Sequence, residues 1–281
     1  MMESLQEKRS LEEQIVHVSE AIRSQPAQAS HRWALFQLLC VTGEGLRALR
    51  QLQAWATLEP EKTQTAQVYR DLVRAEHWRQ KVFAEGQAPG SVLELPQWAN
   101  DMASALRLDA AGKHDEADGT RIRALETASA TAMPVCTDSA RFEWMTDSDT
   151  RLGPLCEILT AGHYRWMPFS DLAGWRISLP VSLVDLIWAP CVLTLTDGSA
   201  VHGFMPARYP GSEAAGDTVR LGYRTEWHET GVATVSALGR RTWMTDTGDF
   251  GMFELATCAF GEYAAGGHLI QNGDGAGGTS H

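Results

Sequence analysis

The 281-residue sequence lacks the features that mark several common classes of protein. No apolar run reaches the roughly 18 residues needed to cross a bilayer, and residues 1–10 are charged, without the apolar centre of a secretory signal. Basic residues are also few: 24 Lys and Arg stand against 35 Asp and Glu, which gives a net charge of −11. Nucleic acids and anionic membrane surfaces are bound by basic faces, so the composition argues against both as partners.

Cysteines and catalytic motifs are sparse as well. The five cysteines are odd in number and widely separated, with no CxxC or Cys/His cluster, so neither a zinc site nor a disulfide framework is indicated. We expect reduced, partly buried thiols and a cytoplasmic location. The sequence contains no GxSxG nucleophile elbow, HExxH zinc motif or Walker A loop. We therefore expect no enzymatic activity, no cofactor and no bound metal.

Residues 1–135 predict an α-helical region. Apolar residues recur there at spacings of three and four, the period of one helix face, beginning with Leu11, Ile15 and Ile22 after the capping-box sequence at Ser10. Prolines and glycines divide the region into six expected helices. We expect Ser30 to cap the second, residues 62–85 to form the fourth, Pro96 to open the fifth, and residues 115–130 to form the sixth.

The helical region also shows a period. Pro26 and Pro60 lie 34 residues apart, the length of a tetratricopeptide repeat. In each of two expected helix pairs, residues 30–58 and 98–128, a turn glycine is followed five residues later by a small alanine, at Gly43 and Ala48 and at Gly112 and Ala117. Repeats of this kind stack helix pairs and leave a concave groove. The alternative is a generic antiparallel helix array in which the proline spacing arises by chance.

Residues 136–260 predict a β-rich domain, and residues 261–281 a Gly-rich flexible tail. Short apolar runs alternate there with turns, and Asp197-Gly198 between two such runs is a strong hairpin signal. We expect a small twisted sheet or a partly open barrel, which makes the whole chain α+β. Strands are expected at residues 141–145, 164–169, 175–179, 191–196, 200–205, 219–227, 241–245 and 250–255, and short helices near 153–161 and 183–187.

Asp147 and Asp149 are the most conspicuous polar pair in this half of the chain. Two aspartates separated by one residue could share a cation, and with His228 they are the centre of the alternative interpretation, a metal-dependent hydrolase. No further carboxylate follows at the spacing of a calcium loop. The favoured interpretation is a turn in which the two aspartates accept backbone N–H bonds and cap the next helix.

Residues 206–213 form an unusual loop that follows the hairpin. Pro206 and Pro210 fix φ, and Gly211 is free to adopt a positive φ, so helix and central strand are both disfavoured. A rigid loop that carries an arginine, a tyrosine and a glutamate is a better recognition surface than a linker. We expect Arg208 to pair with a carboxylate of its own domain, with Glu226 as the candidate.

These segments together resemble the ImpE family, also called TagJ, of accessory proteins of bacterial type VI secretion. The resemblance extends over residues 11–255 and is carried by the order and spacing of residues 35–40, 48–52, 147–154, 164–169, 185–190, 208–213 and 225–227. The chain departs from the family pattern at residues 182–184 and 237–241, which bears on partner specificity. The family-motif residues are Asp147, Asp149, Arg151, Trp166, Trp188, Arg208, Tyr209, Pro210, Gly211, Glu226 and Trp227.

The resemblance implies a non-enzymatic cytoplasmic adaptor. Such proteins are associated with the small subunit of the contractile sheath, binding a helical segment near its N-terminus, and are thought to influence sheath dynamics or sheath disassembly by an AAA+ ATPase. A helical-repeat groove that accepts an amphipathic helix agrees with this. The expected contacts are Trp33, Phe36, Gln37, Trp55 and Tyr69. Besides the hydrolase, a scaffold for another secretion component is the remaining alternative.

Overall fold

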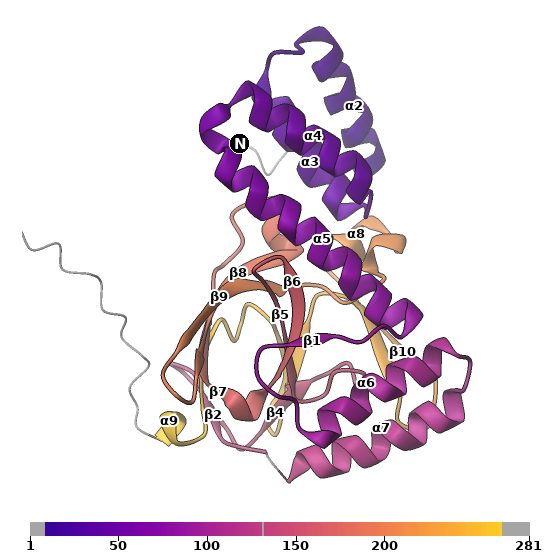
Figure 1. The fold of residues 1–281 in the computed structure, drawn as a ribbon, viewed down its shortest axis with the longest axis vertical. Coiled ribbons are helices and arrows are strands. Elements are labelled where there is room, and N and C mark those ends of the chain that lie inside the picture. Colours follow the sequence, from indigo (N-terminus) through magenta and orange to yellow (C-terminus); the bar gives the residue numbers. More distant parts are fainter. Residues whose placement is uncertain (1–8, 131, 266–281) are drawn as a thin grey trace, which may run out of the picture.

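The computed structural model describes residues 9–130 and 132–265, and it consists of a helical N-terminal region followed by a β-rich region (Figure 1). The expected α+β class is confirmed. The helices of the first region are α2 (Leu11–Ser24), α3 (Ala29–Val41), α4 (Gly45–Leu58), η1 (Pro60–Lys62), α5 (Thr63–Glu85), α6 (Gln97–Ala110) and α7 (His114–Ser129).

Most helix ends follow the sequence signals. The Ser10 hydroxyl accepts the Glu13 N–H at 3.1 Å and the Glu13 carboxylate accepts the Ser10 N–H at 2.9 Å, which completes the capping box of α2. α5 ends at Gly86, which takes a left-handed φ of 66°. The expected cap at Ser30 is wrong: α3 begins at Ala29, and the Ser30 hydroxyl accepts the Gln28 side-chain amide instead. Pro96 lies one position before α6 rather than in its first turn.

Two antiparallel helix pairs, α3–α4 and α6–α7, occupy the positions predicted from the glycine and alanine spacing. Gly43 and Gly112 form the two turns with φ of 78° and 74°, a conformation that an L side chain disfavours. Ala48 and Ala117 are fully buried where the paired helices touch. The pairs are therefore repeat-like in local geometry. No helix among the described residues is both long and apolar enough to cross a membrane.

The main sheet is open and mixed, with nine strands in the order β1-β6-β5-β9-β8-β7-β14-β2-β3. It extends into the helical half of the chain, because β1 joins it from there and pairs in parallel with β6. Its other pairs are antiparallel. The strands are β1 (Gly90–Ser91), β2 (Val135–Cys136), β3 (Arg141–Phe142), β5 (Leu155–Thr160), β6 (His163–Pro168), β7 (Leu172–Ile177), β8 (Trp188–Leu195), β9 (Ala200–Pro206) and β14 (Thr257–Phe260).

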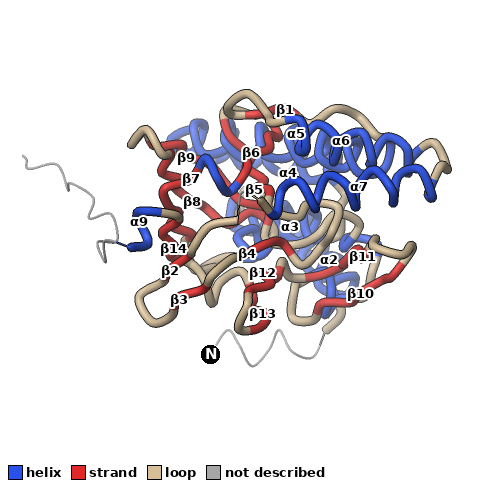
Figure 2. The backbone as a smooth tube through the Cα atoms, turned by 90° about the horizontal axis from the view of Figure 1, so that it is seen from below, coloured by secondary structure: helices blue, strands red, loops and turns tan. Residues whose placement is uncertain are grey.

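Two smaller sheets lie beside the main sheet (Figure 2). One has the order β13-β12-β4, and the other is the β10–β11 hairpin. Their strands are β4 (Met145–Asp147), β12 (Thr242–Thr245), β13 (Gly248–Gly251), β10 (Thr225–Glu229) and β11 (Val235–Gly239). Short helical turns connect the strands: η2 (Phe169–Asp171), η3 (Leu183–Leu186), η4 (Ser212–Ala214), α8 (Asp217–Arg220) and α9 (Glu262–Ala265).

Two expected elements are wrong. Residues 153–161 do not form a helix, because residues 155–159 are buried on both faces as β5, between β6 and β9. Residues 219–227 are not one strand: α8 and a turn occupy the first part, and β10 begins only at Thr225. Of the tail expected over 261–281, residues 262–265 form α9, and 266–281 lie outside the described residues.

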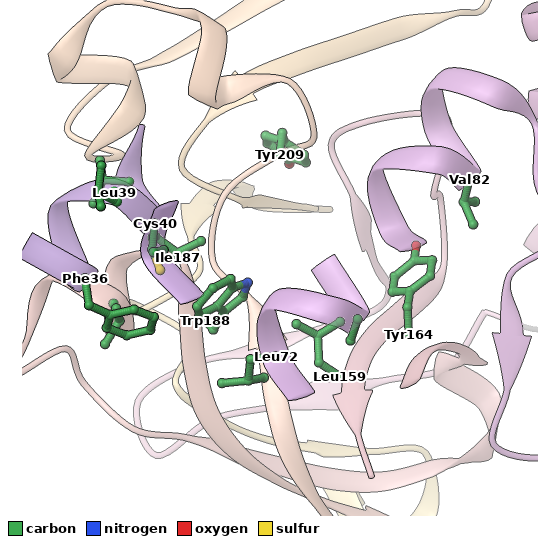
Figure 3. Packing of buried hydrophobic residues seen from close by; sticks show 14 of the residues in the cluster. Phe36, Leu39, Cys40, Leu72, Val82, Leu159, Tyr164, Ile187, Trp188 and Tyr209 are labelled. Atoms are coloured by element: carbon green, nitrogen blue, oxygen red, sulfur yellow. The ribbon is translucent and has the colours of Figure 1, made fainter. Parts of the chain in front are cut away.

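The helical region and the main sheet share one hydrophobic core. Phe36 of α3 and Leu72 of α5 belong to the same buried cluster as Leu159 of β5, Trp188 of β8 and Tyr209 (Figure 3). A second cluster lies within the β-rich region and is rich in aromatic rings, among them Phe169 and Trp175. Because the first cluster is built from both regions, neither region buries all of its apolar surface without the other.

Candidate functional site

A buried charge network lies where α5 crosses the main sheet, and Glu157 is at its centre. Glu157 interrupts the apolar strand β5 and is fully buried. Its carboxylate accepts the Arg79 Nε at 2.7 Å and the Arg79 Nη2 at 3.0 Å, which is a two-point ion pair between α5 and β5. It also accepts the Tyr164 hydroxyl at 2.6 Å and forms an ion pair with Arg241.

Arg79 extends the network to the neighbouring elements. Its Nη1 lies 3.2 Å from the Glu76 carboxylate one helical turn earlier, and its Nη2 donates to the Arg208 carbonyl at 3.2 Å. Glu76 in turn accepts the indole N–H of Trp188 at 3.0 Å. The indole of Trp166, which is fully buried, donates to the Tyr164 hydroxyl. Two of the family-motif tryptophans therefore serve as hydrogen-bond donors inside the network.

Asp147 lies on the other side of Arg241, with 3.2 Å between its Oδ2 and the Arg241 Nη1. Its Oδ1 accepts the Tyr209 hydroxyl at 2.8 Å and the Asp149 N–H at 2.8 Å. Burial raises the pKa of Asp147 to about 6, against the opposing effect of the Arg241 charge. Asp147 is thus held by Arg241, Tyr209 and the backbone of its own turn, with 1% of its surface exposed.

Asp149 forms the second half of the predicted turn. Its carboxylate accepts the Arg151 N–H at 3.0 Å, the Arg151 Nε at 2.9 Å and the Ala237 N–H at 3.1 Å. The prediction that both aspartates accept backbone N–H bonds in a turn is confirmed. The expectation that this turn caps a helix is wrong, because the turn leads into strand β5.

The loop at residues 206–213 joins the sheet to the helical region. The Arg208 guanidinium donates to the carbonyls of Val41 at 2.8 Å and of Cys40 at 3.4 Å, the last residues of α3, and to the Arg220 carbonyl at 2.8 Å. A cation at the C-terminal end of a helix binds the free carbonyls and complements the helix dipole. The expected pair with Glu226 is wrong: Glu226 of β10 is half-buried, and its carboxylate lies 3.5 Å from the Arg224 Nε.

The rest of this loop is held from both sides. Gly211 has a φ of 89°, as expected from its place after Pro210. The Ser212 hydroxyl donates to the Tyr209 carbonyl at 2.6 Å and accepts the Gly239 N–H at 2.8 Å. The Tyr209 ring, which is fully buried, stands edge-on to Trp227 with 6.1 Å between the ring centres. The loop therefore connects α3, the β10–β11 hairpin and the Asp147 turn.

The network is a buried junction of charged side chains between the helical region and the sheet. The network contains four arginines and four carboxylates, so its formal charges balance. The arginines are Arg79, Arg151, Arg208 and Arg241, and the carboxylates are those of Glu76, Asp147, Asp149 and Glu157. Within residues 9–130 and 132–265, no group of three or more His, Cys, Asp and Glu side chains is arranged to hold a metal ion.

The structure does not gather the three residues of the hydrolase interpretation. Asp147 and Asp149 are buried in ion pairs, whereas His228 is exposed on β10, opposite Ser236 of β11. Asp147 borders a cavity of about 430 Å³, but its Oδ1 accepts the Tyr209 hydroxyl and the Asp149 N–H, and its Oδ2 faces Arg241. The geometry therefore favours a structural role for the Asp147–Asp149 turn.

The comparisons with known proteins agree with these motifs. The family described as ImpE protein matches residues 139–259. The type VI secretion system accessory component TagJ of Pseudomonas aeruginosa is 36% identical over 251 residues, which cover 89% of this chain and 87% of that protein. The chain belongs to the ImpE family of type VI secretion accessory proteins. An X-ray crystal structure of protein VPA1032 from Vibrio parahaemolyticus has a similar fold, with a TM-score of 0.82, 25% identity, and coverage of 89% of this chain and 93% of that one.

The ImpE match and the junction coincide along the chain. The matched segment contains Asp147, Glu157, Arg208 and Arg241, while Arg79 reaches it from α5 outside the matched segment. Asp147 and Arg208 were identified from the sequence. Arg79, Glu157 and Arg241 were missed. A lone glutamate within the apolar run of residues 155–159 was the available signal, because a charge inside a buried strand requires a partner.

The five expected partner contacts of this ImpE protein lie where α3, α4 and α5 meet. Trp33 is in ring contact with Phe36, Trp55 and Tyr69, with centre-to-centre distances of 5.2, 4.7 and 5.1 Å. Phe36 and Trp55 are buried, whereas Trp33, Gln37 and Tyr69 are half-buried. Burial raises the pKa of Tyr69 to about 12. The aromatic cluster therefore sets how the three helices cross and leaves three side chains partly accessible.

Proposed function

We propose that this chain is a non-enzymatic, cytoplasmic adaptor that binds a helical segment near the N-terminus of the small subunit of the type VI contractile sheath. Its kinship with an accessory component of type VI secretion supports the pathway. The observation that carries the proposal is that the two regions of the fold differ in what they bury and what they present. The charged motif residues Asp147, Asp149 and Arg208 are buried in the junction, and the paired helices provide the extended surface.

Paired helices that stack side by side are suited to holding another helix. In the proposed complex the half-buried Trp33, Gln37 and Tyr69 contribute contacts to the partner. Phe36 and Trp55 act indirectly, because their burial keeps the three helices in place. An adaptor bound to the sheath subunit would alter access to its N-terminal segment. We propose that the adaptor modulates sheath dynamics, or disassembly by the AAA+ ATPase, in this way.

The test is capture of the small sheath subunit by the intact chain. The full chain is required because the helical and β-rich regions share a core. We expect the immobilised protein to retain the complete small subunit and to lose a subunit that lacks its N-terminal helix, with the large sheath subunit alone as the control. Equal retention of the truncated subunit, or no retention of either form, would refute the proposal and favour a scaffold for another secretion component.

A further inference from the structure

A groove lies between α4 and α5 beside the charge network, and Glu76, Trp188 and Arg208 of the network contribute to its lining. Its volume is about 580 Å³, within the range of about 300–1,000 Å³ typical of binding pockets. Leu46 and Leu49 of α4 form one wall, Val73 of α5 forms part of the other, and Ile187 and Trp188 contribute to the lining from the β-rich region. The groove therefore lies on the same three-helix array as the aromatic cluster, and the shared core supports it from the sheet side.

The apolar wall of the groove reaches the surface at Leu46. This side chain is 80% exposed, while Leu49 and Val73 next to it are half-buried. A single exposed leucine is common on protein surfaces. Leu46 differs because it borders a preformed cavity whose lining continues the apolar surface inward. An inserted apolar side chain would therefore contact the protein on several sides.

The rim of the groove is basic, although the chain as a whole carries a net charge of −11. Arg70 lines the groove and donates to the neutral amide oxygens of Gln67 at 2.6 Å and Gln53 at 2.9 Å. Within the described chain, Arg70 forms no ion pair with a carboxylate. Arg50 lies one turn after Leu46 on α4 and is exposed.

The other charged side chains around the groove do not neutralise Arg70 and Arg50. Arg74 pairs with Asp71 at 2.9 Å and is 65% exposed, and Arg47 pairs with Glu44 at the start of α4. Glu76 faces the groove but is engaged by Arg79 and Trp188. Acidic side chains of a partner would therefore complete the charge pattern, whereas basic ones would be repelled.

We infer that this groove is the docking site for an amphipathic helix whose apolar stripe is flanked by aspartate or glutamate. The inference rests on the proposed adaptor function and specifies its site. Apolar residues at i, i+3 or i+4, and i+7 of the partner helix would follow the wall from Leu46 to Val73. Its flanking carboxylates would face Arg70 and Arg50, which fixes the direction and register of docking.

The experiment measures the affinity of the intact chain for a labelled peptide of the small sheath subunit's N-terminal helix, by fluorescence anisotropy. We expect Leu46→Asp to weaken binding about tenfold or more, as for a central anchor. Arg70→Glu should weaken it about threefold to tenfold and reduce its dependence on salt. The matched controls are Val16→Asp and Arg23→Glu on α2, where Val16 is 57% exposed and Arg23 is also exposed.

Each outcome decides between the two proposals. Weaker binding by the groove variants alone supports the groove as the docking site. If the wild type and the groove variants bind the peptide equally well, the groove is not the docking site, and the adaptor function is unaffected. The same conclusion follows if the α2 controls lose as much affinity as the groove variants. A wild type that does not bind the peptide refutes the adaptor proposal and the groove with it. All four substituted positions are exposed or partly exposed, and thermal unfolding of each variant checks that the fold is intact.

Discussion

Glu157→Gln is the substitution that tests the buried network most directly. It removes the negative charge that faces Arg79 and Arg241, and it keeps the size and shape of the side chain. The amide also presents an N–H group where a carboxylate oxygen now accepts from an arginine or from Tyr164. Two guanidinium groups then share a site that is fully buried and has lost its central anion.

The expected cost follows from the contacts that remain. Breaking a buried ion pair by removing one partner costs about 3–5 kcal/mol, because the other charge stays desolvated. Arg79 retains Glu76 and Arg241 retains Asp147, so the two arginines are not left without anions. The single substitution nevertheless removes an anionic partner from both arginines. We expect a loss of about 3–5 kcal/mol in the free energy of unfolding.

Urea denaturation followed by tryptophan fluorescence measures this loss, with the slope of the transition checked for constancy. The matched control is Glu116→Gln, which removes the same charge from an exposed pair with Lys113, where the carboxylate side chain is 61% exposed. We expect the control to change stability by less than about 0.5 kcal/mol. A Glu157→Gln variant as stable as the control would show that the network contributes little to holding the helical region on the sheet.

Three further substitutions test the surroundings of the network by the same denaturation assay. Arg208→Met should cost about 2–4 kcal/mol by leaving buried carbonyls at the end of α3 without a donor, whereas the exposed Arg224→Met should be nearly neutral; equal effects would refute the capping role. Burial raises the pKa of Asp147 from 3.8 to about 6. Between these two pH values the Asp147 carboxyl is protonated in the folded state and ionised in the unfolded state. The free energy of unfolding of the wild type relative to Asp147→Asn should therefore rise by about 2–3 kcal/mol as pH falls from 7 to 4, and a difference independent of pH would contradict the shift. Gly43→Ala should cost about 1–2 kcal/mol, because φ is 78° and a Cβ would stand 2.8 Å from the Glu213 Cγ; an unchanged midpoint would show that the turn relaxes freely.

The sequence alone determined the features that depend on near neighbours in the chain. Helix periodicity, the capping box at Ser10 and the turn glycines Gly43 and Gly112 act over a few residues, so the helix pairs could be predicted closely. The Asp147–Asp149 turn is equally local, since each carboxylate binds a backbone N–H two residues ahead. The family motifs could be recognised for the same reason, because they are short segments read in order.

Only the tertiary structure decided how the two regions meet. Arg79 and Glu157 are 78 residues apart and Arg208 and Val41 are 167 residues apart, so no local pattern pairs them. Strand β5 was predicted as a helix because a short apolar run has no reliable period, and its state is set by the strands on either side. Each buried charge in the junction needs a partner, because removing a charge from water is costly. Those partners are distant in the sequence and become neighbours only in the folded protein.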